Sequence, residues 1–341
     1  MKLSVMSVAD HYPQRARTVA EFYKQIIKQA VYAEELGYEG FWIAEHHFHE
    51  YGVVPDPSVM LAAIAQRTER LKLGTAISVL TFRNPLLVAE SYAMVDQLSN
   101  GRLCLGVGSG YLKHEFEGFG IDAAKKRDIF NDHLDIVRGL LQGERVEFHG
   151  RHVDVPGVQI NVLPVQRPVP IYEGILRREA AYEIGVKGRN MLWVPYTAIN
   201  NFSEVQPMMD EFHRGRSESG NPANPESSAA AFHTFVAETD AAAREQASEA
   251  FDLYVESRLY AKKQVYDDIL RSGLALFGSV STVTDKLISL YKMGVQNVLA
   301  IQNFGFLNDI QVRASMSLLA TKVLPEVHHR IGRVAPKKIS A

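Results

Sequence analysis

The part of the chain with the clearest potential for chemistry is a short apolar segment that ends in an acid and two histidines. Residues 40–47 read GFWIAEHH. An apolar run of this length, bounded by glycine and by polar residues, predicts a strand that is buried on both faces. Such a strand presents Glu45 and His46 at its carboxyl end, where parallel-sheet proteins hold reactive side chains. An imidazole there can exchange protons near neutral pH, so His46 is a candidate catalytic residue.

The histidines of this region allow more than one interpretation. Adjacent residues on an extended chain point to opposite sides, so at most one of His46 and His47 can face a given pocket. A purely structural role is the alternative, with His46 hydrogen-bonded at the mouth of the fold and His47 packed between helices. A metal site needs convergent ligands, and the sequence has neither an H-E-x-x-H pattern nor a cysteine pair. We therefore expect no metal.

A glycine-rich segment follows another candidate strand. Residues 106–111 read GVGSGY, but Tyr111 stands where a dinucleotide fingerprint has its last glycine, and no helix is expected to open there. Gly108 and its neighbours could let a flat ligand or a phosphate approach the backbone closely. They could equally form a plain turn. The sequence leaves both interpretations open.

Two arginines follow a further candidate strand, in residues 173–178, which read EGILRR. They stand at the predicted start of a helix, where a helix N-terminus with two guanidinium groups would form a good anion site. The alternative is a solvated basic first turn, which the helix macrodipole disfavours. We therefore expect an anion near Arg177.

The elements that would position these residues alternate along the whole chain. Strands are expected at residues 3–8, 40–44, 71–79, 102–107, 169–172, 190–194, 230–236 and 298–302. Helical patterns are expected at residues 18–36, 58–69, 85–98, 125–141, 178–186, 201–218, 241–254, 282–293 and 309–323. Strict alternation favours parallel pairing, and eight repeats predict an α/β fold of the (β/α)8 TIM-barrel type. A doubly wound sheet is disfavoured because the first strand is followed by DHYP, without a glycine loop.

The predicted organisation is one barrel domain over residues 1–330. Residues 144–166 are rich in strand formers and turn residues, which predicts a surface hairpin and loop insertion. Residues 254–277 form a long connection that could act as a lid. Residues 331–341 are expected to be a flexible tail.

Composition excludes several classes of partner. The 341 residues carry 37 Lys plus Arg against 39 Asp plus Glu, so no strong field would attract nucleic acid or a membrane surface. The single cysteine, Cys104, rules out an intrachain disulfide and fits a reducing compartment. The chain shows no signal-peptide pattern and no run of 18 apolar residues, so we expect a cytoplasmic protein.

Several blocks of sequence, in order along nearly the whole chain, resemble the bacterial luciferase-like, flavin-dependent monooxygenases. These blocks are EHHFHEYG at residues 45–52, LGTA at 73–76, NP at 84–85, DQLSNGR at 96–102, EFEGFGID at 115–122, GVQNV at 294–298 and VLP at 323–325. The resemblance implies a (β/α)8 barrel, usually dimeric, that holds FMN at the carboxyl ends of its strands.

The resemblance also implies roles for individual residues. His46 matches the family's functional histidine beside the flavin ring, and Arg127 matches a phosphate-binding arginine. Ala76 and Ile77 match a position on the third strand where these barrels often carry a non-prolyl cis peptide. Taken with the patterns above, the residues expected to bind the cofactor are Glu45, Ala76, Ile77, Gly108, Ser109, Arg127, Glu173, Leu176, Arg177 and Trp193.

This chain departs from the luciferase alpha subunit around the phosphate. Ser109 stands where that subunit has an arginine, Arg177 where it has a phosphate-binding serine, and Ala180 where it has a threonine. Either the positive charge has moved from the fourth-strand loop to the fifth, or the phosphate site is degraded. Gly108 stands at the position of the family's reactive cysteine, so Cys104 is expected to be a core residue.

The activity implied by the resemblance is oxygenation of a small organic substrate by O2 and reduced FMN, through a flavin hydroperoxide. No nicotinamide domain is visible, so a separate NAD(P)H:flavin reductase would supply reduced flavin. Water would be excluded by apolar and aromatic side chains, for which the candidates are Trp42, Phe82, Tyr111, Trp193, Tyr196 and Phe304. The chain is expected to form a homodimer through the helices at residues 58–69 and 85–98.

Three other functions remain open from the sequence. The wider superfamily contains oxidoreductases that use the deazaflavin F420, so F420 is the alternative cofactor. The chain could also be a flavin-binding subunit without turnover, for which Ser109 and Ala180 leave room. A metal-dependent barrel hydrolase is the third alternative. The sequence does not identify the substrate.

Overall fold

Eight parallel strands close into a barrel in the computed structural model, which describes residues 1–221, 224–258 and 263–333. Around the barrel the strands are β1 (Lys2–Ser7), β2 (Gly40–Ile43), β3 (Lys72–Thr75), β5 (Leu103–Gly108), β8 (Ile171–Ile175), β9 (Asn190–Trp193), β10 (Ser228–Ala237) and β12 (Asn297–Asn303). Each pairs with the next in parallel, and β12 returns to β1 with Lys2 opposite Asn297. The predicted TIM barrel is confirmed, and all eight predicted strands belong to it.

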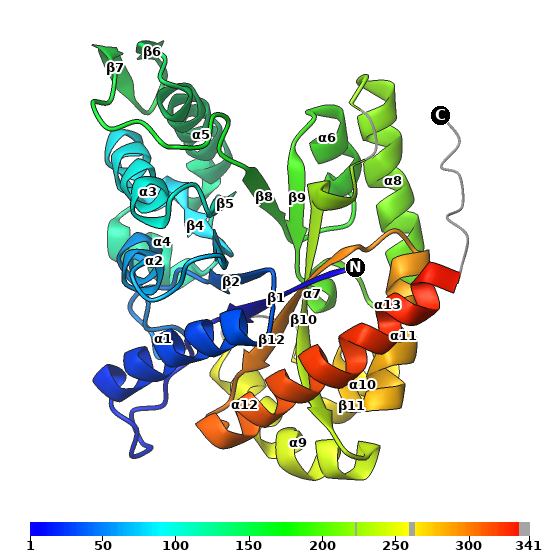
Figure 1. The fold of residues 1–341 in the computed structure, drawn as a ribbon. Coiled ribbons are helices and arrows are strands. Elements are labelled where there is room, and N and C mark those ends of the chain that lie inside the picture. The colour runs from blue at the N-terminus through cyan, green and yellow to red at the C-terminus, as the bar shows by residue number, and fades with distance from the viewer. Residues whose placement is uncertain (222–223, 259–262, 334–341) are drawn as a thin grey trace.

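Helices surround the strands on the outside, as Figure 1 shows. They are α1 (Val19–Glu35), α2 (Pro57–Ala65), α3 (Pro85–Ser99), α4 (Lys113–Phe119), α5 (Lys126–Gln142), α6 (Ala180–Val186), α7 (Pro195–Ala198), α8 (Val205–Glu218), α9 (Asp240–Ser257), α10 (Tyr266–Ser272), α11 (Val280–Lys292), α12 (Asp309–Leu318) and α13 (Leu324–Arg333). A π-helical turn, η5 (Leu319–Val323), joins α12 to α13. No helix among the described residues is long and apolar enough to cross a membrane.

Local sequence signals set the helix ends. The hydroxyl of Thr18 accepts from the backbone N–H of Glu21, and the Glu21 carboxylate accepts in return from the Thr18 backbone, which forms a capping box at the start of α1. Gly37 follows the end of α1 with a φ of +80°, where a side chain would be strained. Pro85 stands at the first turn of α3, which Asn84 caps.

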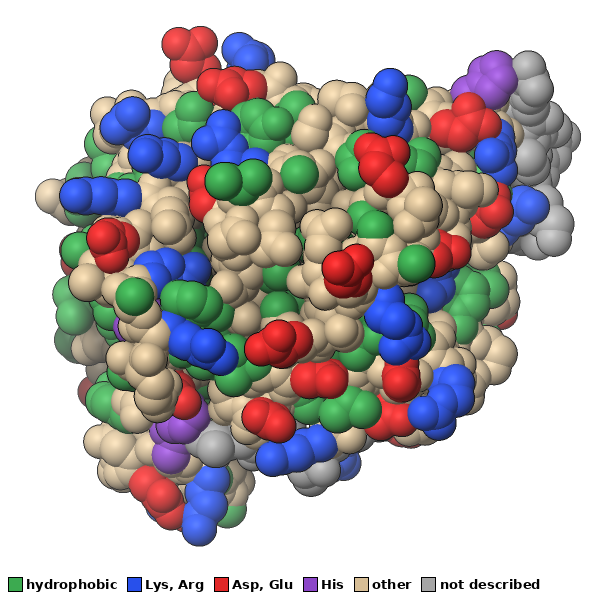
Figure 2. Space-filling model, turned by 90° about the horizontal axis from the view of Figure 1, so that it is seen from below, with side chains coloured by type: hydrophobic (Ala, Val, Ile, Leu, Met, Phe, Trp, Pro, Cys, Tyr) green, Lys and Arg blue, Asp and Glu red, His purple; other side chains and the backbone are tan. Residues whose placement is uncertain are grey.

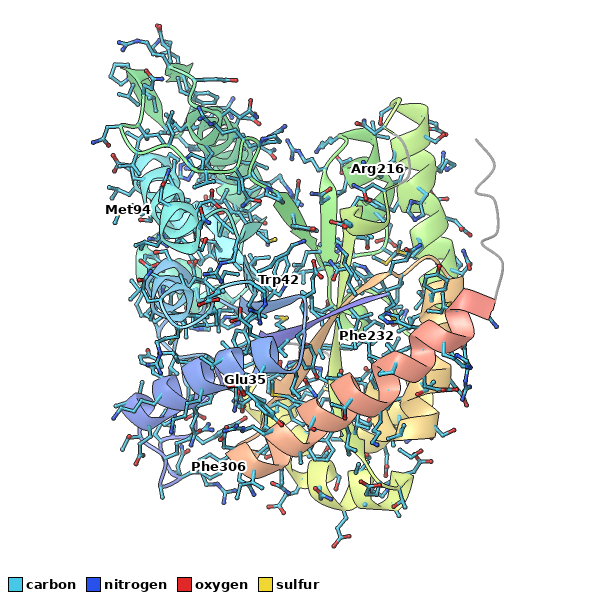
Figure 3. The ribbon with its side chains drawn as sticks, in the orientation of Figure 1. Glu35, Trp42, Met94, Arg216, Phe232 and Phe306 are labelled. Carbon is cyan, nitrogen blue, oxygen red and sulfur yellow. The ribbon has the colours of Figure 1, made fainter. Side chains whose placement is uncertain are left out.

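The barrel interior is filled by side chains rather than by solvent. Figure 3 shows Trp42 and Phe232 near the centre of the molecule, between the helices on either side. Trp42 lies so close to Gly74 on the neighbouring strand that a Cβ there would be 2.1 Å from its ring. Gly74 therefore makes room for an indole, which explains a glycine inside a buried strand.

The third strand differs from its prediction as one continuous strand over residues 71–79. It breaks into β3 and β4 (Ser78–Val79) around a cis peptide bond between Ala76 and Ile77. Backbone hydrogen bonds tie this break to the end of β2, since Ala76 N donates to Ile43 O at 2.8 Å and Glu45 N donates to Ile77 O at 3.3 Å. Both Ala76 and Ile77 are thereby held at the carboxyl end of the barrel.

One strand, β11 (Leu276–Ser279), is not among the predicted strands. It pairs with residues 234–237 of β10, beyond the point where β10 pairs with β12. The strand begins inside the connection at residues 254–277 that we considered as a lid, and Leu276 and Phe277 are buried. Residues 259–262 of that connection lie outside the described residues, and its role as a lid stays a prediction.

Residues 144–166 contain an antiparallel hairpin of β6 (Val146–His149) and β7 (Asp154–Val158), which stands at the upper left of Figure 1. Helix α13 extends through Arg333, and residues 334–341 of the expected tail lie outside the described residues.

One of the blocks shared with the flavin-dependent family has a structural role here. The guanidinium of Arg102 donates hydrogen bonds to the backbone carbonyls of Ala65, Thr68, Leu71 and Ser99. These carbonyls lie in α2, α3 and the loop before β3. Arg102 thus joins two helices to the barrel and takes no part in the site described below.

Candidate active site

A cavity of about 540 Å³ opens at the carboxyl ends of the strands. Its wall includes residues at or after the carboxyl ends of β1, β2, β3, β5, β8, β9 and β12, together with the first turn of α5 and side chains of α4 and α9. Ten predicted site residues line it: Glu45, His46, Ala76, Ile77, Gly108, Ser109, Arg127, Leu176, Arg177 and Trp193. Glu173, the eleventh, is not part of the wall.

His46 lines the cavity and is fixed by a buried carboxylate. Its Nδ1 lies 3.3 Å from Oε1 of Glu115, a residue of α4 that is 1% exposed. Because a carboxylate only accepts hydrogen bonds, Nδ1 carries the proton in this contact. The other ring nitrogen, Nε2, is then the one that can take up or release a proton. The backbone of Gly52 packs closely against the His46 side chain, since a Cβ at position 52 would lie 2.7 Å from the Cβ of His46.

Glu45 and His47 hold neighbouring segments of the scaffold together. Oε1 of Glu45 lies 3.0 Å from Nε2 of His47, and its Oε2 accepts from the Ser78 hydroxyl at 3.0 Å and the Val79 N–H at 3.2 Å. The Glu45 side chain, 0% exposed, has both oxygens occupied. His47 is also buried and does not line the cavity. Of the two adjacent histidines, only His46 lies in the cavity wall.

The glycines after β5 make room for the break in the third strand. A Cβ at Gly108 would lie 2.3 Å from Cδ1 of Ile77, and one at Gly174 would lie 3.0 Å from its Cγ2. Ile77 therefore projects between two glycines and forms an apolar shelf in the cavity wall. No helix opens within residues 106–111, as expected; α4 begins two residues later, at Lys113.

One end of the cavity is cationic. Lys126 and Arg127 lie at the first turn of α5, and Arg177 follows β8, the neighbour of β5 in the barrel. Burial lowers the pKa of Lys126, and the nearby positive charges of Arg127 and Arg177 lower it further. The three cations are therefore close enough to repel one another, as expected for a site that receives an anion.

Glu173 supports this cationic end from behind. Glu173 is 2% exposed. Its Oε1 lies 3.2 Å from Nη1 of Arg127, and its Oε2 lies 2.7 Å from Nη1 of Arg189. The prediction that Glu173 itself contacts the cofactor is not supported by this position. A buried carboxylate between two guanidinium groups orients Arg127 instead.

The helix after Arg177 is shorter than predicted. We expected it to begin at Arg178, but α6 begins at Ala180 and has seven residues, so Arg177 lies outside it. An anion near Arg177 is therefore expected because three cations lie together there, and not because a helix begins there. Ser109 and Ala180, the two departures from the luciferase pattern, line the same cavity.

The apolar part of the wall is only partly as predicted. Tyr111, Trp193 and Tyr196 line the cavity, whereas Trp42, Phe82 and Phe304 pack elsewhere. Trp193 is 0% exposed, and its indole N–H donates to the Ser228 hydroxyl at 3.2 Å. The indole thus presents an apolar face without leaving a buried donor unsatisfied. Cys104 is buried in the core, as expected.

The lining residues that were not predicted include four with polar side chains: Glu115, Lys126, Tyr51 and Tyr254. Glu115 offered one signal, because an acid amid the apolar positions of a short helix needs a buried partner. Lys126 stands beside the predicted Arg127. Tyr51 and Tyr254 are 203 positions apart in sequence, and no local pattern joins them.

The residues present fit a phosphate-bearing cofactor. Phosphate is recognised by convergent guanidinium and ammonium groups, which Arg127, Arg177 and Lys126 provide. Both FMN and F420 carry phosphate, so this group of cations does not distinguish them. Among the described residues, no group of three or more His, Cys, Asp or Glu side chains could hold a metal ion.

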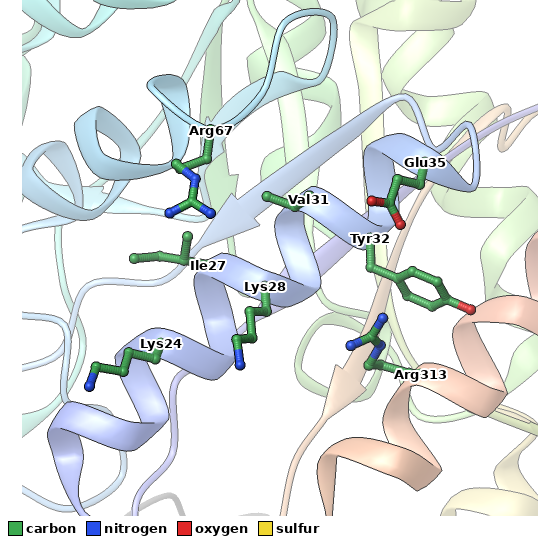
Figure 4. A pocket seen from close by; sticks show the side chains of 8 residues that line it. All are labelled: Lys24, Ile27, Lys28, Val31, Tyr32, Glu35, Arg67 and Arg313. Atoms are coloured by element: carbon green, nitrogen blue, oxygen red, sulfur yellow. The ribbon is translucent and has the colours of Figure 1, made fainter.

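A second concavity, of about 280 Å³, lies on the outer surface of α1 (Figure 4). Its lining is Lys24, Ile27, Lys28, Val31, Tyr32, Glu35, Arg67 and Arg313. None of these residues follows the carboxyl end of a barrel strand, and the groove lacks a buried acid–base pair. On the face of the molecule shown in Figure 2, acidic and basic side chains are intermixed, which agrees with the balanced composition.

Comparison with known proteins places this geometry in a family. A family model described as luciferase-like monooxygenase matches residues 1–297. Protein y4vJ of Sinorhizobium fredii, which is uncharacterized, is 28% identical over 334 residues, or 92% of this chain and 94% of that protein. An F420-dependent glucose-6-phosphate dehydrogenase of Amycolatopsis mediterranei is 33% identical over 156 residues, or 44% of this chain and 46% of its own.

Two further similarities concern oxygenases. The oxygenase component of a flavin-dependent trigonelline monooxygenase from Acinetobacter baylyi is 27% identical over 236 residues, or 68% of this chain and 64% of that protein. The crystal structure of monooxygenase RslO1 from Streptomyces bottropensis superposes with a TM-score of 0.88 at 27% identity, covering 96% of this chain and all of that one. The chain belongs to the luciferase-like monooxygenase family.

Proposed function

We propose that this protein is the oxygenase of a two-component, FMN-dependent monooxygenase that inserts one atom of O2 into a small organic substrate. The observation that carries the proposal is a single cavity with three cations at one end and a carboxylate-oriented histidine in its wall. Membership of the luciferase-like family supports oxidoreductase chemistry. The similarity to RslO1 and to the trigonelline oxygenase favours oxygenation over other reactions in that family.

The chain's own residues would divide the work as follows. Arg127, Arg177 and Lys126 would bind the phosphate of FMN. Ser109 would line the same cavity with an uncharged side chain. This arrangement favours a relocated phosphate site over a degraded one, because Arg177 and Arg127 share the cavity. Bound reduced FMN supplies two electrons, so that one atom of O2 enters the substrate and the other leaves as water.

His46 would hold or move a proton at Nε2, because its Nδ1 is engaged by Glu115. Ile77 would support the ring of the cofactor from one side, since it projects from between Gly108 and Gly174. Trp193 would keep water away from the reacting atoms by presenting a buried apolar face.

Two partners follow from this proposal. The chain would receive reduced flavin from a separate NAD(P)H:flavin reductase, as the name of the trigonelline oxygenase component suggests for that protein. It would also form a homodimer through α2 and α3. Val59, Leu87, Met94 and Leu98 on these helices are between 46% and 68% exposed. Figure 3 shows Met94 at the outer margin of the molecule, where a second copy could cover it.

The test is titration of FMN, oxidised and then reduced, against the wild type, Arg177→Ala and Arg178→Ala, followed by flavin fluorescence. Arg178 is the matched control, because it lies outside the cavity and is 3.9 Å from Glu204. We expect Arg177→Ala to weaken binding by about 1.5–3 kcal/mol, the value of a hydrogen bond to a charged group, and Arg178→Ala to leave it unchanged.

Absence of FMN binding in both redox states would contradict the proposal. The same titration with F420 then decides whether the cofactor is the deazaflavin used by the dehydrogenase relative. O2 consumption that requires both reduced FMN and an organic substrate separates an oxygenase from a flavin-binding subunit without turnover.

A further inference from the structure

Three tyrosine side chains meet in the wall of the cavity. They belong to Tyr51 in the loop after β2, Tyr196 after β9 and Tyr254 on α9. The hydroxyls of Tyr51 and Tyr254 lie 3.1 Å apart, and both influence the pKa of the nearby Tyr196 hydroxyl, which burial raises. The three residues are each 5% exposed or less. Each hydroxyl carries one proton and can also accept, and the contact between Tyr51 and Tyr254 uses one of the three protons.

A buried positive charge lies directly behind this tyrosine cluster. The guanidinium carbon of Arg258 is 4.0 Å from the ring centre of Tyr196 and 5.4 Å from that of Tyr254. Arg258 is 4% exposed and does not line the cavity. Burial lowers the pKa of its guanidinium, but Tyr196, Tyr254 and Tyr51 raise it by more, so the group stays charged. Its field favours negative charge on the cavity side of the three hydroxyls.

Two of the three tyrosines follow strands that do not neighbour those of the phosphate cations. The cations follow the neighbouring strands β5 and β8, whereas Tyr51 follows β2 and Tyr254 follows β10; Tyr196 follows β9, which pairs with β8. The ring of Tyr51 packs against the ring of His46, with 4.5 Å between the ring centres. A ligand held by the three hydroxyls would therefore lie beside the histidine that handles protons.

The surroundings of the cluster define the rest of the ligand. Val8, Ile301, Leu192 and Trp193 contribute the neighbouring cavity wall, and all four are apolar and buried. They suit a hydrocarbon or aromatic body. A cationic substrate would be repelled by Arg258. A wholly apolar substrate would carry no oxygen atom to accept hydrogen bonds from the three hydroxyls.

We infer that Tyr51, Tyr196 and Tyr254, backed by Arg258, form a substrate subsite for an oxyanion carried on an apolar body, that is, a carboxylate, phenolate or enolate. This inference rests on the proposed oxygenase function, because it assigns the second ligand of the same cavity. The hydroxyls donate to the oxyanion, and the guanidinium stabilises its charge through them. The site then orders the substrate with its charged end at the cluster and its apolar body toward His46 and the cofactor.

The test is equilibrium binding of 2-naphthoate and of its uncharged analogue 2-naphthamide, measured by calorimetry on both FMN-loaded and cofactor-free protein. We expect 2-naphthoate to bind more tightly than 2-naphthamide. We expect Tyr254→Phe and Tyr51→Phe to weaken 2-naphthoate by about tenfold, the lower range for loss of a charge-assisted hydrogen bond, while FMN affinity is unchanged.

Tyr172→Phe is the matched control, because the Tyr172 hydroxyl is part-buried outside the cavity and donates to Glu226 O at 3.1 Å. It should bind both probes as the wild type does. Equal affinity for the two probes, no binding of 2-naphthoate, or equal losses in Tyr172→Phe and Tyr254→Phe would each overturn the inference. Failure of FMN to bind would instead count against the proposed function, and the cofactor-free titration would still decide the subsite.

Discussion

Oε1 of Glu115 accepts from two directions at once: it lies 3.3 Å from Nδ1 of His46 and 2.9 Å from the backbone N of His47. The carboxylate therefore fixes both the position of the chain after β2 and the tautomer of the imidazole in the cavity. Because Glu115 holds the imidazole through Nδ1, we infer that it is a positioning residue for His46.

Replacement of Glu115 should lower turnover without weakening flavin binding. We expect Glu115→Ala to reduce turnover by about 10- to 100-fold, since a small misplacement of a catalytic group is costly. Glu115→Gln should retain more activity, because its amide oxygen can still accept from Nδ1–H. Nitrogen NMR of labelled histidine should show a mixture of tautomers in the alanine variant. Glu117→Gln on the same helix, which is exposed, is the control, and a uniform Nδ1–H tautomer in Glu115→Ala would count against this role.

Phosphate binding should depend on pH through Lys126. Burial, Arg127 and Arg177 lower the pKa of this ammonium group, so it loses its proton at a lower pH than an ordinary lysine. Because only the protonated form attracts an anion, FMN affinity should fall as pH rises through the lowered pKa. Lys126→Met should bind more weakly and lose this pH dependence, as measured by flavin fluorescence. Lys125→Met, on the exposed neighbour, should keep it; an unchanged pH profile in Lys126→Met would refute the assignment.

His233 should make the fold less stable in acid. It is 0% exposed, neither ring nitrogen has a hydrogen-bond partner among the residues that the structure describes, and burial together with Arg258 lowers its pKa well below 6.5. The unfolded chain then binds one more proton than the folded chain below pH 6.5, so stability falls with falling pH at up to about 1.4 kcal/mol per unit.

Removal of the imidazole should remove that part of the slope. Urea unfolding of His233→Leu between pH 7.5 and pH 5 should show a flatter dependence than the wild type, with little loss at pH 7.5 because no hydrogen bond is broken. His329→Leu, at an exposed position, should behave as the wild type. Equal slopes in His233→Leu and in the wild type would show that His233 does not carry the effect.

Gly108 should be intolerant of a side chain. The Cβ of Gly108→Ala would lie 2.3 Å from Cδ1 of Ile77, so the shelf in the cavity wall must shift. We expect a loss of about 1–3 kcal/mol in the free energy of unfolding, the usual cost of overpacking, together with weaker flavin binding. Gly332→Ala is the control, since nothing lies within 4 Å of its added Cβ. Full stability of Gly108→Ala would mean that Ile77 is free to move.

Cys104 should be unreactive in the folded protein. Burial raises the pKa of its thiol to about 12, so almost no thiolate is present at pH 8. A colourimetric disulfide reagent should therefore label no thiol before denaturant is added and one thiol afterwards, since the chain has a single cysteine. Labelling of the native protein at the rate of a free thiol would contradict the buried position.

Several features of this protein were determined by the sequence itself. The alternation of apolar runs with helical patterns predicted all eight barrel strands, because burial on both faces leaves a continuous apolar signal. Glu45 and His46 could be placed at the end of a strand for the same reason, and helix caps such as Thr18 act over a few residues. The ordered blocks from residue 45 to residue 325 identified the family, as the match over residues 1–297 confirms.

Only the tertiary structure decided which polar groups meet. The break at Ala76 depends on hydrogen bonds to β2, and β11 depends on an edge of β10, so neither has a local signal. Glu173 contacts Arg127 and Arg189, which come from other parts of the chain. The cluster of tyrosines from separate loops is likewise invisible to any sequence period. The physical reason is that a hydrogen bond or an ion pair acts over a few ångströms in space, whereas a sequence pattern records only neighbours along the chain.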